Sequence, residues 1–325
     1  MFALWKRYRH VTAAAPLMLA MIATAAAQAP YPNRNITLVL PFAAGSGTDT
    51  TTRLIGKELG TALGVSTVIE NKAGANGSIA ASYVARSPAD GYTLFVTTNT
   101  THSANPYLLK NMTYDPVKDF TPIARTGDLP FMLVIHPDIP ANSVAELIAL
   151  AKKEPGKYSY ASGSSSAIVS GATFARLAGI DLLHVPYKSS PPALTDVIAG
   201  RVSMMFIDVP TGLPHVNAKA LKALAVTTRK PSALLPHLPT MDDTVKGFDI
   251  TSWQGYLGPA NMPKDIVVRL NAEIRKIIER PDIKNQLAER GMEAFSGTPE
   301  EFDAFLKEQL VLWEKLIADA GIEKQ

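Results

Sequence analysis

The chain has 325 residues, of which 46% are hydrophobic and 19% charged, as in an ordinary globular protein, and it contains no cysteine. Its length suggests about two domains. Three of the 32 basic residues and none of the 29 acidic ones lie in the first 27 positions, so residues 28–325 carry no net charge. A neutral chain has no overall field to attract nucleic acid or acidic ligands, so any anion must be held by local geometry.

The N-terminus has the pattern of a secretory signal peptide. Residues 6–9 carry three basic side chains, residues 11–23 are mainly apolar, and Ala25-Ala26-Ala27 fits a cleavage site. The apolar run is too short to act as a membrane anchor across a bilayer core of about 30 Å. We therefore predict cleavage after Ala27 and a periplasmic protein. Because cysteine is absent, disulfides and a lipid-modified N-terminal cysteine are excluded, and we expect the protein to be free after cleavage.

Residues 36–98 alternate between strand and helix patterns. Strands are predicted at 36–41, 66–70 and 92–98, and helices at 50–63 and 79–86. This alternation is typical of a parallel α/β sheet, in which ligands bind beyond the carboxyl ends of the strands. The loops 43–48, 71–77 and 97–103 lie at such ends.

The loop 43–48 (AAGSGT) joins the first strand to a helix that Thr48 or Asp49 can cap. The first backbone N–H groups of a helix lack internal partners, and the helix dipole favours negative charge there. Thr50 stands where a dinucleotide fingerprint needs its third glycine, and no Gly-Lys-Ser/Thr follows. The loop therefore indicates an anion site that is not a nucleotide site.

The same pattern returns in the second part of the chain. Strand 158–161 leads into the serine loop 162–166 (SGSSS) and a helix at 167–178, which predicts a second anion site. Further elements are expected at 131–135, 143–153, 182–185, 191–199, 202–207 and 223–228. A third section has a strand at 252–258 and amphipathic helices that begin at Pro263 and Thr298, and we expect these helices to pack on the first unit.

Motifs for catalysis are absent from the sequence. It has no G-x-S-x-G elbow and no H-E-x-x-H, and its six histidines lack the spacing of metal ligands, so no metal or cofactor is expected. A hydrolase triad built from Ser165 with a distant His and Asp stays open, because triads are defined by geometry. The remaining chemistry is hydrogen bonding, which indicates a binding protein.

With these loops in place, the chain resembles the solute-binding proteins of tripartite tricarboxylate transporters, the Bug family. The resemblance covers essentially all of residues 28–325 and is carried by LVLPFAAGSGTDTTTRLIG, ENKAGANGSIAASYVARSPADGYTLFVTT, HSANPYL, YASGSSS, LLHVPYKSSPPALTDVIAGRVSMMFID, LKALAVTT and SWQGYLGPANMP. It implies a type II periplasmic binding fold, a Venus flytrap of two α/β lobes, each a mostly parallel sheet flanked by helices. The implied organisation is a signal peptide at 1–27, a first lobe at 28–126 and 249–325, and a second lobe at 127–248.

The resemblance also implies the activity. Such a receptor is not an enzyme. It closes on a small carboxylate and delivers it to a membrane permease with one large and one small subunit, driven by an ion gradient. We expect a monomer with no nucleic-acid partner. An exported hydrolase-like enzyme and a carboxylate-sensing module for a signalling receptor are the alternatives.

The predicted ligand-binding residues lie in loops and at strand ends. They are Phe42, Ala43, Ala44, Gly45, Ser46, Thr48, Asp49, Asn76, Thr97, Thr98, His102, Ser162, Gly163, Ser164, Ser165, Ser166, Tyr187 and Asp208. Two of them also suit structural roles, Asp49 as a helix cap and His102 as a loop residue. Asp208, at a strand end facing the cleft, can accept from water or from a ligand amine.

The chain departs from the family pattern at three loop positions. Ser46 interrupts the usual consecutive glycines, and Ser189 follows Tyr-Lys in place of glycine. The third departure is Gly74-Ala75-Asn76-Gly77-Ser78, where the family commonly has G-G-N or G-A-G-G-N. These departures bear on the identity of the acid. Aromatic carboxylates, C4-dicarboxylates, citrate-like acids and acidic amino acids all fit the sequence.

Overall fold

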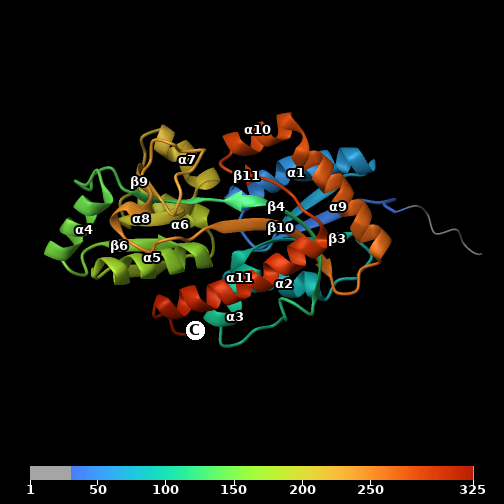
Figure 1. Cartoon of the computed structure of the whole chain (residues 1–325), viewed down its shortest axis with the longest axis horizontal. Coiled ribbons are helices and arrows are strands. Elements are labelled where there is room, and N and C mark those ends of the chain that lie inside the picture. The colour runs from blue at the N-terminus through green and yellow to red at the C-terminus, as the bar shows by residue number, and fades with distance from the viewer. Residues whose placement is uncertain (1–30, 325) are drawn as a thin grey trace, which may run out of the picture. The chain divides into compact units, whose positions relative to one another are not determined.

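The computed structural model describes residues 31–324, whose strands form two sheets (Figure 1). The predicted signal peptide lies outside the described residues. The first sheet has the order β11-β4-β10-β3-β1-β2. Its strands are β1 (Ile36–Leu40), β2 (Thr67–Asn71), β3 (Thr93–Thr98), β4 (Phe120–Leu129), β10 (Ser252–Pro259) and β11 (Glu293–Ala294).

The second sheet has the order β7-β6-β8-β5-β9. Its strands are β5 (Phe131–Ile135), β6 (Ser159–Ser162), β7 (Leu183–Pro186), β8 (Met204–Asp208) and β9 (Lys222–Val226). We call each sheet, with the helices against it, a lobe. The two-lobed α/β architecture expected from the sequence is confirmed.

The sheets are mixed, whereas the sequence suggested mostly parallel ones. Strand β1 pairs in parallel with β2 and β3, but β10 is antiparallel to both β3 and β4. In the second lobe β6 is parallel to β7 and β8, while β5 is antiparallel to β8 and β9. The antiparallel strands lie where the chain passes between lobes, since β4 ends at Leu129 and β5 begins at Phe131. The lobe boundaries at 126/127 and 248/249 remain a prediction.

Helices cover both faces of each sheet. They are α1 (Gly47–Leu63), α2 (Ser78–Ala85), α3 (Asn105–Leu108), α4 (Val144–Lys153), α5 (Ser165–Ala178), α6 (Ser190–Ile198), α7 (Val209–Asn217), α8 (Met241–Thr244), α9 (Lys264–Glu279), α10 (Pro281–Glu289) and α11 (Pro299–Asp319). A short 3-10 turn, η1 (Ala75–Gly77), and a π-helix, η2 (Thr100–Ala104), precede α2 and α3. No helix within residues 31–324 has the length and apolar character needed to cross a membrane.

The alternation of side chains along β1 explains the packing of the first lobe. Leu38 and Leu40 face a core shared with α1 and α9, while Val39 faces a second core shared with α2 and α11. Full burial of such an aliphatic side chain contributes about 1.5–3 kcal/mol. Four of the five residues of β1 are therefore apolar, Thr37 being the exception, because both faces of the sheet are covered.

Helix α1 begins three residues earlier than predicted. Its N-cap is Ser46, whose hydroxyl accepts from the Asp49 N–H, so the assignment of the cap to Thr48 or Asp49 was wrong. The predicted C-terminus is confirmed, because Gly64 adopts the left-handed conformation (φ 73°) that ends many helices. The N-terminus of α1 thus lies directly beside the end of β1.

Four helices were not predicted: α3, α7, α8 and α10. Helix α7 contains Pro210 and Pro214, and proline inside a helix removes a backbone donor, so this segment has the sequence pattern of a loop. Helix α10 begins directly after α9 at Pro281, where the sequence shows one continuous amphipathic run. These misses matter because α7 contributes to the site.

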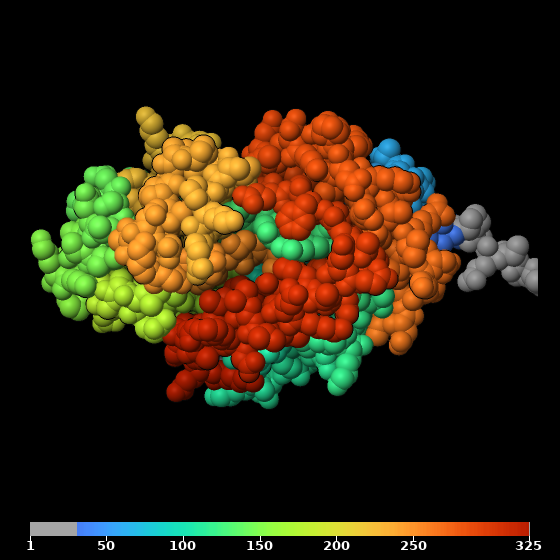
Figure 2. All heavy atoms as spheres, in the orientation of Figure 1, coloured from blue at the N-terminus to red at the C-terminus, as the bar shows by residue number. Residues whose placement is uncertain are grey.

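Helix α11 connects the two lobes. Its first half packs Phe302 and Leu306 into the first lobe, whereas Trp313 and Ile317 belong to the core of the second. In Figure 2 the red residues of α11 lie against the yellow-green residues of the second lobe, in agreement with the contact between α11 and α5. The expectation that this helix packs on the first unit therefore holds only for its first half.

Candidate functional site

A small cavity lies between the lobes, at the carboxyl ends of the central strands. Its volume is about 20 Å³, room for about one water molecule. Residues from both lobes line it: Phe42, Ser46, Gly47, Thr48, Thr98, Thr100, Leu129, Phe131, Ser164, Ser190, Asp208 and Ser252. Six of these residues were among the predicted contacts, namely Phe42, Ser46, Thr48, Thr98, Ser164 and Asp208.

Four helix N-termini meet at this cavity. Ser46 to Thr48 belong to the start of α1, Ser164 caps α5, Ser190 begins α6, and Asp208 caps α7. Each helix end carries a partial positive charge. At α7, however, the Val209 N–H donates to the Pro130 carbonyl, the Thr211 N–H donates to Asp208 and Pro210 has no N–H, and α6 has prolines at its second and third residues. Among the described residues that line the cavity there is no Arg, Lys or His. The helix dipoles and hydroxyl groups therefore favour an anion without a cationic side chain, except close to the carboxylate of Asp208, which lines the same cavity.

The donors of the first loop are engaged within the protein. The Ala43 N–H donates to Ser189 Oγ (3.1 Å), the Gly45 N–H to Asp49 Oδ2 (3.0 Å), and the Ser46 N–H to the Ala43 carbonyl (3.2 Å). Ala44 and Gly45 are exposed to solvent. Ser46 is 3% exposed and lines the cavity, and after its hydroxyl accepts from the Asp49 N–H it still has its own hydrogen to donate.

Direct hydrogen bonds join the lobes around the cavity. Ser189 binds Ala43, the Asn99 amide donates to Ser166 Oγ (2.8 Å), and the Ser165 N–H donates to Thr100 Oγ1 (3.3 Å). Both Ser189 and Ser165 are fully buried. The structure is therefore a closed form, in which serine and threonine side chains occupy donors and acceptors of the opposite lobe.

Asp49 faces away from the cavity. Its carboxylate pairs with Arg53 and accepts from the Gly45 N–H and the Asn71 amide. Burial acts to raise the pKa of Asp49, but the hydrogen bonds from Arg53, Gly45 and Asn71 hold the pKa below its usual value. The side chain thus remains ionised and fixes the shape of the loop.

His102 lies in the aromatic core of the first lobe. Its ring contacts Phe95 and Phe120, and Nδ1 lies 2.6 Å from Thr97 Oγ1. Burial lowers the pKa of His102 to about 3, so the ring is neutral at physiological pH. The structure therefore places His102 and Thr97 away from the cavity, although both were predicted as contacts.

Residues of the serine loop 162–166 have three different kinds of surroundings. Ser162 Oγ lies 2.6 Å from His184 Nε2, and Gly163 packs so closely on the Ser189–Ser190 backbone that a Cβ there would lie 2.2 Å from the Ser189 carbonyl carbon. Ser165 Oγ is buried without a hydrogen-bond partner in the described structure. No base therefore contacts Ser165, which removes the geometric support for a hydrolase triad.

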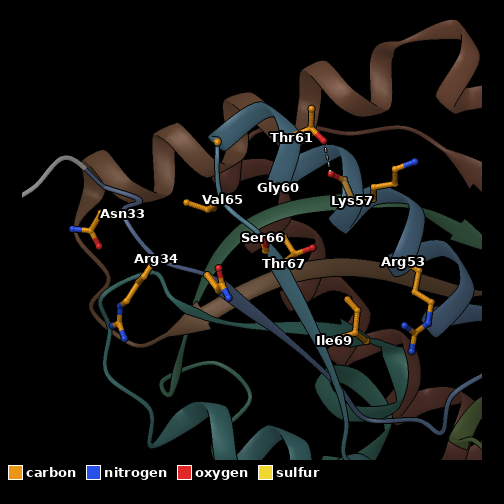
Figure 3. A pocket seen from close by; sticks show the side chains of 12 residues that line it. Asn33, Arg34, Arg53, Lys57, Gly60, Thr61, Val65, Ser66, Thr67 and Ile69 are labelled. Atoms are coloured by element: carbon orange, nitrogen blue, oxygen red, sulfur yellow. Dashed lines mark hydrogen bonds between the residues drawn. The ribbon is translucent and has the colours of Figure 1, made fainter.

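Two larger hollows lie outside the cavity. One, of about 650 Å³, is lined by residues of both lobes, including the predicted Asn76 and Tyr187 together with Arg86 and Lys188. The other, of about 860 Å³, is an open surface hollow beside α1 and the edge strand β2 (Figure 3). The second hollow includes Arg34 and Arg53, which are paired with Asp90 and Asp49 in the structure. It lies on the first lobe alone, so we do not assign the ligand to it.

Six cavity residues were missed by the sequence reasoning. They are Gly47, Thr100, Leu129, Phe131, Ser190 and Ser252. The signal for Ser190 was present, because Ser189-Ser190 followed by two prolines is typical of a helix start. Leu129 and Phe131 flank the passage between the lobes, and a sequence pattern does not reveal that position.

Comparison with known proteins identifies the family. The model of the family described as tripartite tricarboxylate transporter family receptor matches residues 51–322. The chain is 34% identical over 293 residues to a protein of Pseudomonas sp. (strain P51) named UPF0065 protein in tcbD-tcbE intergenic region, covering 89% of this chain and 87% of that protein. It is 30% identical over 309 residues to protein BugT of Bordetella pertussis, covering 92% and 95% of the two chains.

Solved structures agree with this relation. R. palustris Rpa4515 with adipate is 36% identical with a TM-score of 0.89, over 91% of this chain and all of that one. MatC of Rhodopseudomonas palustris with bound malate is 29% identical with a TM-score of 0.83, over 88% of this chain and all of that one. Because the family is one of receptors, the expectation that the chain is not an enzyme is confirmed. The chain therefore belongs to the tripartite tricarboxylate transporter receptor family, the solute-binding proteins among which the Bug proteins are found.

Proposed function

We propose that this protein is a periplasmic receptor that binds a small carboxylate between its lobes and delivers it to a tripartite tricarboxylate-type permease. The observation that carries the proposal is the meeting of four helix N-termini at one cavity lined by hydroxyl groups. The structures of relatives with adipate and malate support a small carboxylate as the ligand class. The permease has one large and one small subunit, and the receptor acts as a monomer.

Binding requires the lobes to open, because a cavity of about 20 Å³ holds no carboxylic acid. The ligand then replaces hydrogen bonds that join the lobes in the closed form, such as Ala43 to Ser189 and Ser165 to Thr100. A hydrogen bond to a charged acceptor contributes about 1.5–3 kcal/mol. Three or four such bonds suffice for a Kd near one micromolar, which corresponds to about −8 kcal/mol, after the costs of association.

A thermal-shift screen of mono-, di- and tricarboxylates, followed by calorimetry, tests the proposal. We expect at least one acid to raise the melting temperature and to bind with a Kd of about micromolar, because it binds only the folded state. The neutral amide of the same acid serves as the matched control and should not bind. If no acid in the panel changes the melting temperature at millimolar concentration, the proposal fails.

The location of the protein follows from its first 27 residues. We expect export, cleavage after Ala27 and release as an unanchored protein, because the segment has a basic start, an apolar run and an A-x-A site. N-terminal sequencing of the protein from a periplasmic fraction should begin at Gln28. A mature chain that still starts at Met1 would contradict this expectation.

A further inference from the structure

Asp208 is the only residue with an ionisable side chain among the described residues that line the cavity. It is the last residue of β8, in the middle of the second sheet, and is 7% exposed. Its Oδ1 accepts from the Thr211 N–H (3.0 Å) and from Thr211 Oγ1 (2.5 Å). Both donors belong to the second lobe, so the carboxylate stays fixed to that lobe when the cleft opens.

In the closed form this carboxylate lies against the N-terminus of α1 in the first lobe. A Cβ on Gly47, the first residue of α1, would lie only 2.0 Å from Asp208 Oδ1. The backbone of Gly47 is not in the left-handed region, so glycine is needed here for space rather than for conformation. Asp208 therefore occupies the place that an anion takes at a helix N-terminus.

The charge of Asp208 has no cationic partner. Among the residues that the structure describes, Asp208 takes part in no ion pair, and its donors are Thr211 and the Gly47 N–H. Burial raises the pKa of Asp208 in spite of these hydrogen bonds. A second carboxylate placed beside it would be repelled, since like charges at short distance disfavour each other. The ligand carboxylate must therefore bind at the other helix N-termini, those of α5 and α6, where Ser164 and Ser190 line the cavity.

We infer that Asp208 is a specificity residue, which selects carboxylic acids that carry a hydroxyl or ammonium group next to the bound carboxylate. Thr211 binds only Oδ1 of Asp208, so the other oxygen can accept from a ligand hydroxyl or ammonium group, whereas a plain methylene brings no donor to it. The inference rests on the proposed carboxylate receptor function and names the ligand class of the same cavity.

The test compares acids that differ only by one hydroxyl: propanoate and lactate, succinate and malate, glutarate and 2-hydroxyglutarate, adipate and 2-hydroxyadipate. Calorimetry measures each pair on the intact protein and on Asp208→Asn, which keeps the side-chain size and the ability to cap α7. In the pair that binds, we expect the hydroxy acid to bind the unsubstituted protein about tenfold more tightly. In Asp208→Asn the plain acid should gain affinity and the preference should disappear.

Ser190→Ala is the control, because it removes an uncharged hydroxyl from the same cavity and should weaken both acids of a pair alike. A plain acid that binds as tightly as its hydroxy partner overturns the inference, as does a preference that survives in Asp208→Asn. Equal weakening of both acids in Asp208→Asn would give Asp208 a structural role only. Absence of binding by every acid would instead defeat the proposed carboxylate function.

Discussion

His102 shows how the surroundings of a single side chain set its charge. The ring is fully buried between Phe95 and Phe120, and its Nε2 has no hydrogen-bond partner in the described structure. A charged imidazolium there would lose its hydration, which is why burial lowers the pKa of His102 to about 3 from an ordinary value of 6.5. Below pH 6.5 the unfolded chain takes up a proton that the folded chain does not bind, so stability falls as the pH falls toward 3.

The resulting prediction concerns acid stability. Between pH 7.5 and pH 5, His102 should cost the folded state about 2 kcal/mol, because the unfolded state alone is protonated. The free energy of unfolding, measured with urea, should therefore fall by about 2 kcal/mol less in His102→Gln than in the unsubstituted protein between pH 7.5 and pH 5. The exposed His237→Gln is the control and should follow the unsubstituted protein. Parallel pH profiles for the protein and His102→Gln would contradict the assignment.

At the scale of secondary structure, the site is built from helix starts capped by serine. Ser164 accepts from the Ala167 N–H at the start of α5 and lines the cavity, whereas Ser143 accepts from the Glu146 N–H at the start of α4, away from the cavity. The two caps are chemically alike and both lie in the second lobe. A comparison of Ser164 with Ser143 can therefore distinguish the contribution of a cap to stability from its contribution to ligand binding.

We expect Ser164→Ala and Ser143→Ala each to lower the free energy of unfolding by about 1 kcal/mol, the usual cost of a lost N-cap. Only Ser164→Ala should also weaken binding of the acid found in the screen, by about tenfold or more, because it removes a hydroxyl donor beside the ligand. Chemical denaturation and calorimetry on both variants measure the two effects. Equal affinities in the two variants would show that Ser164 only caps the helix.

The extent of sequence prediction is clearest at this scale. The strands and helices around loops 43–48 and 162–166 could be predicted, because apolar runs, small-residue loops and terminal glycines are local signals. The cap at Ser46 and the helix α7 were missed, since several hydroxyl residues compete for one cap and two prolines mask the helix. The contacts of Asp208 with Gly47 and of Ser189 with Ala43 join residues far apart in the chain, which no local pattern reveals.

At the scale of the whole described molecule, α11 holds the lobes together. Gln309 Oε1 accepts from the indole N–H of Trp253 in the first lobe and of Trp313 on α11 (3.2 Å each). Trp313 is 1% exposed and packs into the core of the second lobe. The second half of α11 therefore contributes to the stability of a lobe whose sheet ends about 90 residues earlier in the chain, at Val226.

Trp313→Ala should lower the free energy of unfolding by about 3–5 kcal/mol, since it removes a large buried side chain and leaves a cavity. Leu312→Ala, the adjacent residue with 45% of its surface exposed, should change it by less than about 0.5 kcal/mol. Urea denaturation followed by tryptophan-independent circular dichroism makes the comparison. A loss of similar size in both variants, or none in Trp313→Ala, would mean that α11 does not anchor the second lobe.

The place of β10 in the first sheet has a consequence for the order of folding. Strand β10 (Ser252–Pro259) lies between β3 and β4, and it pairs with both, whereas all five strands of the second sheet lie between residues 131 and 226. During synthesis all five strands of the second sheet can therefore pair while the first sheet still lacks β10 between β3 and β4. Because contacts between distant segments form slowly, the gap in the first sheet should close last, after residue 259 becomes available, and the edge strand β11 can be added only after residue 294. The second sheet is then already formed, and the binding cavity is assembled against it.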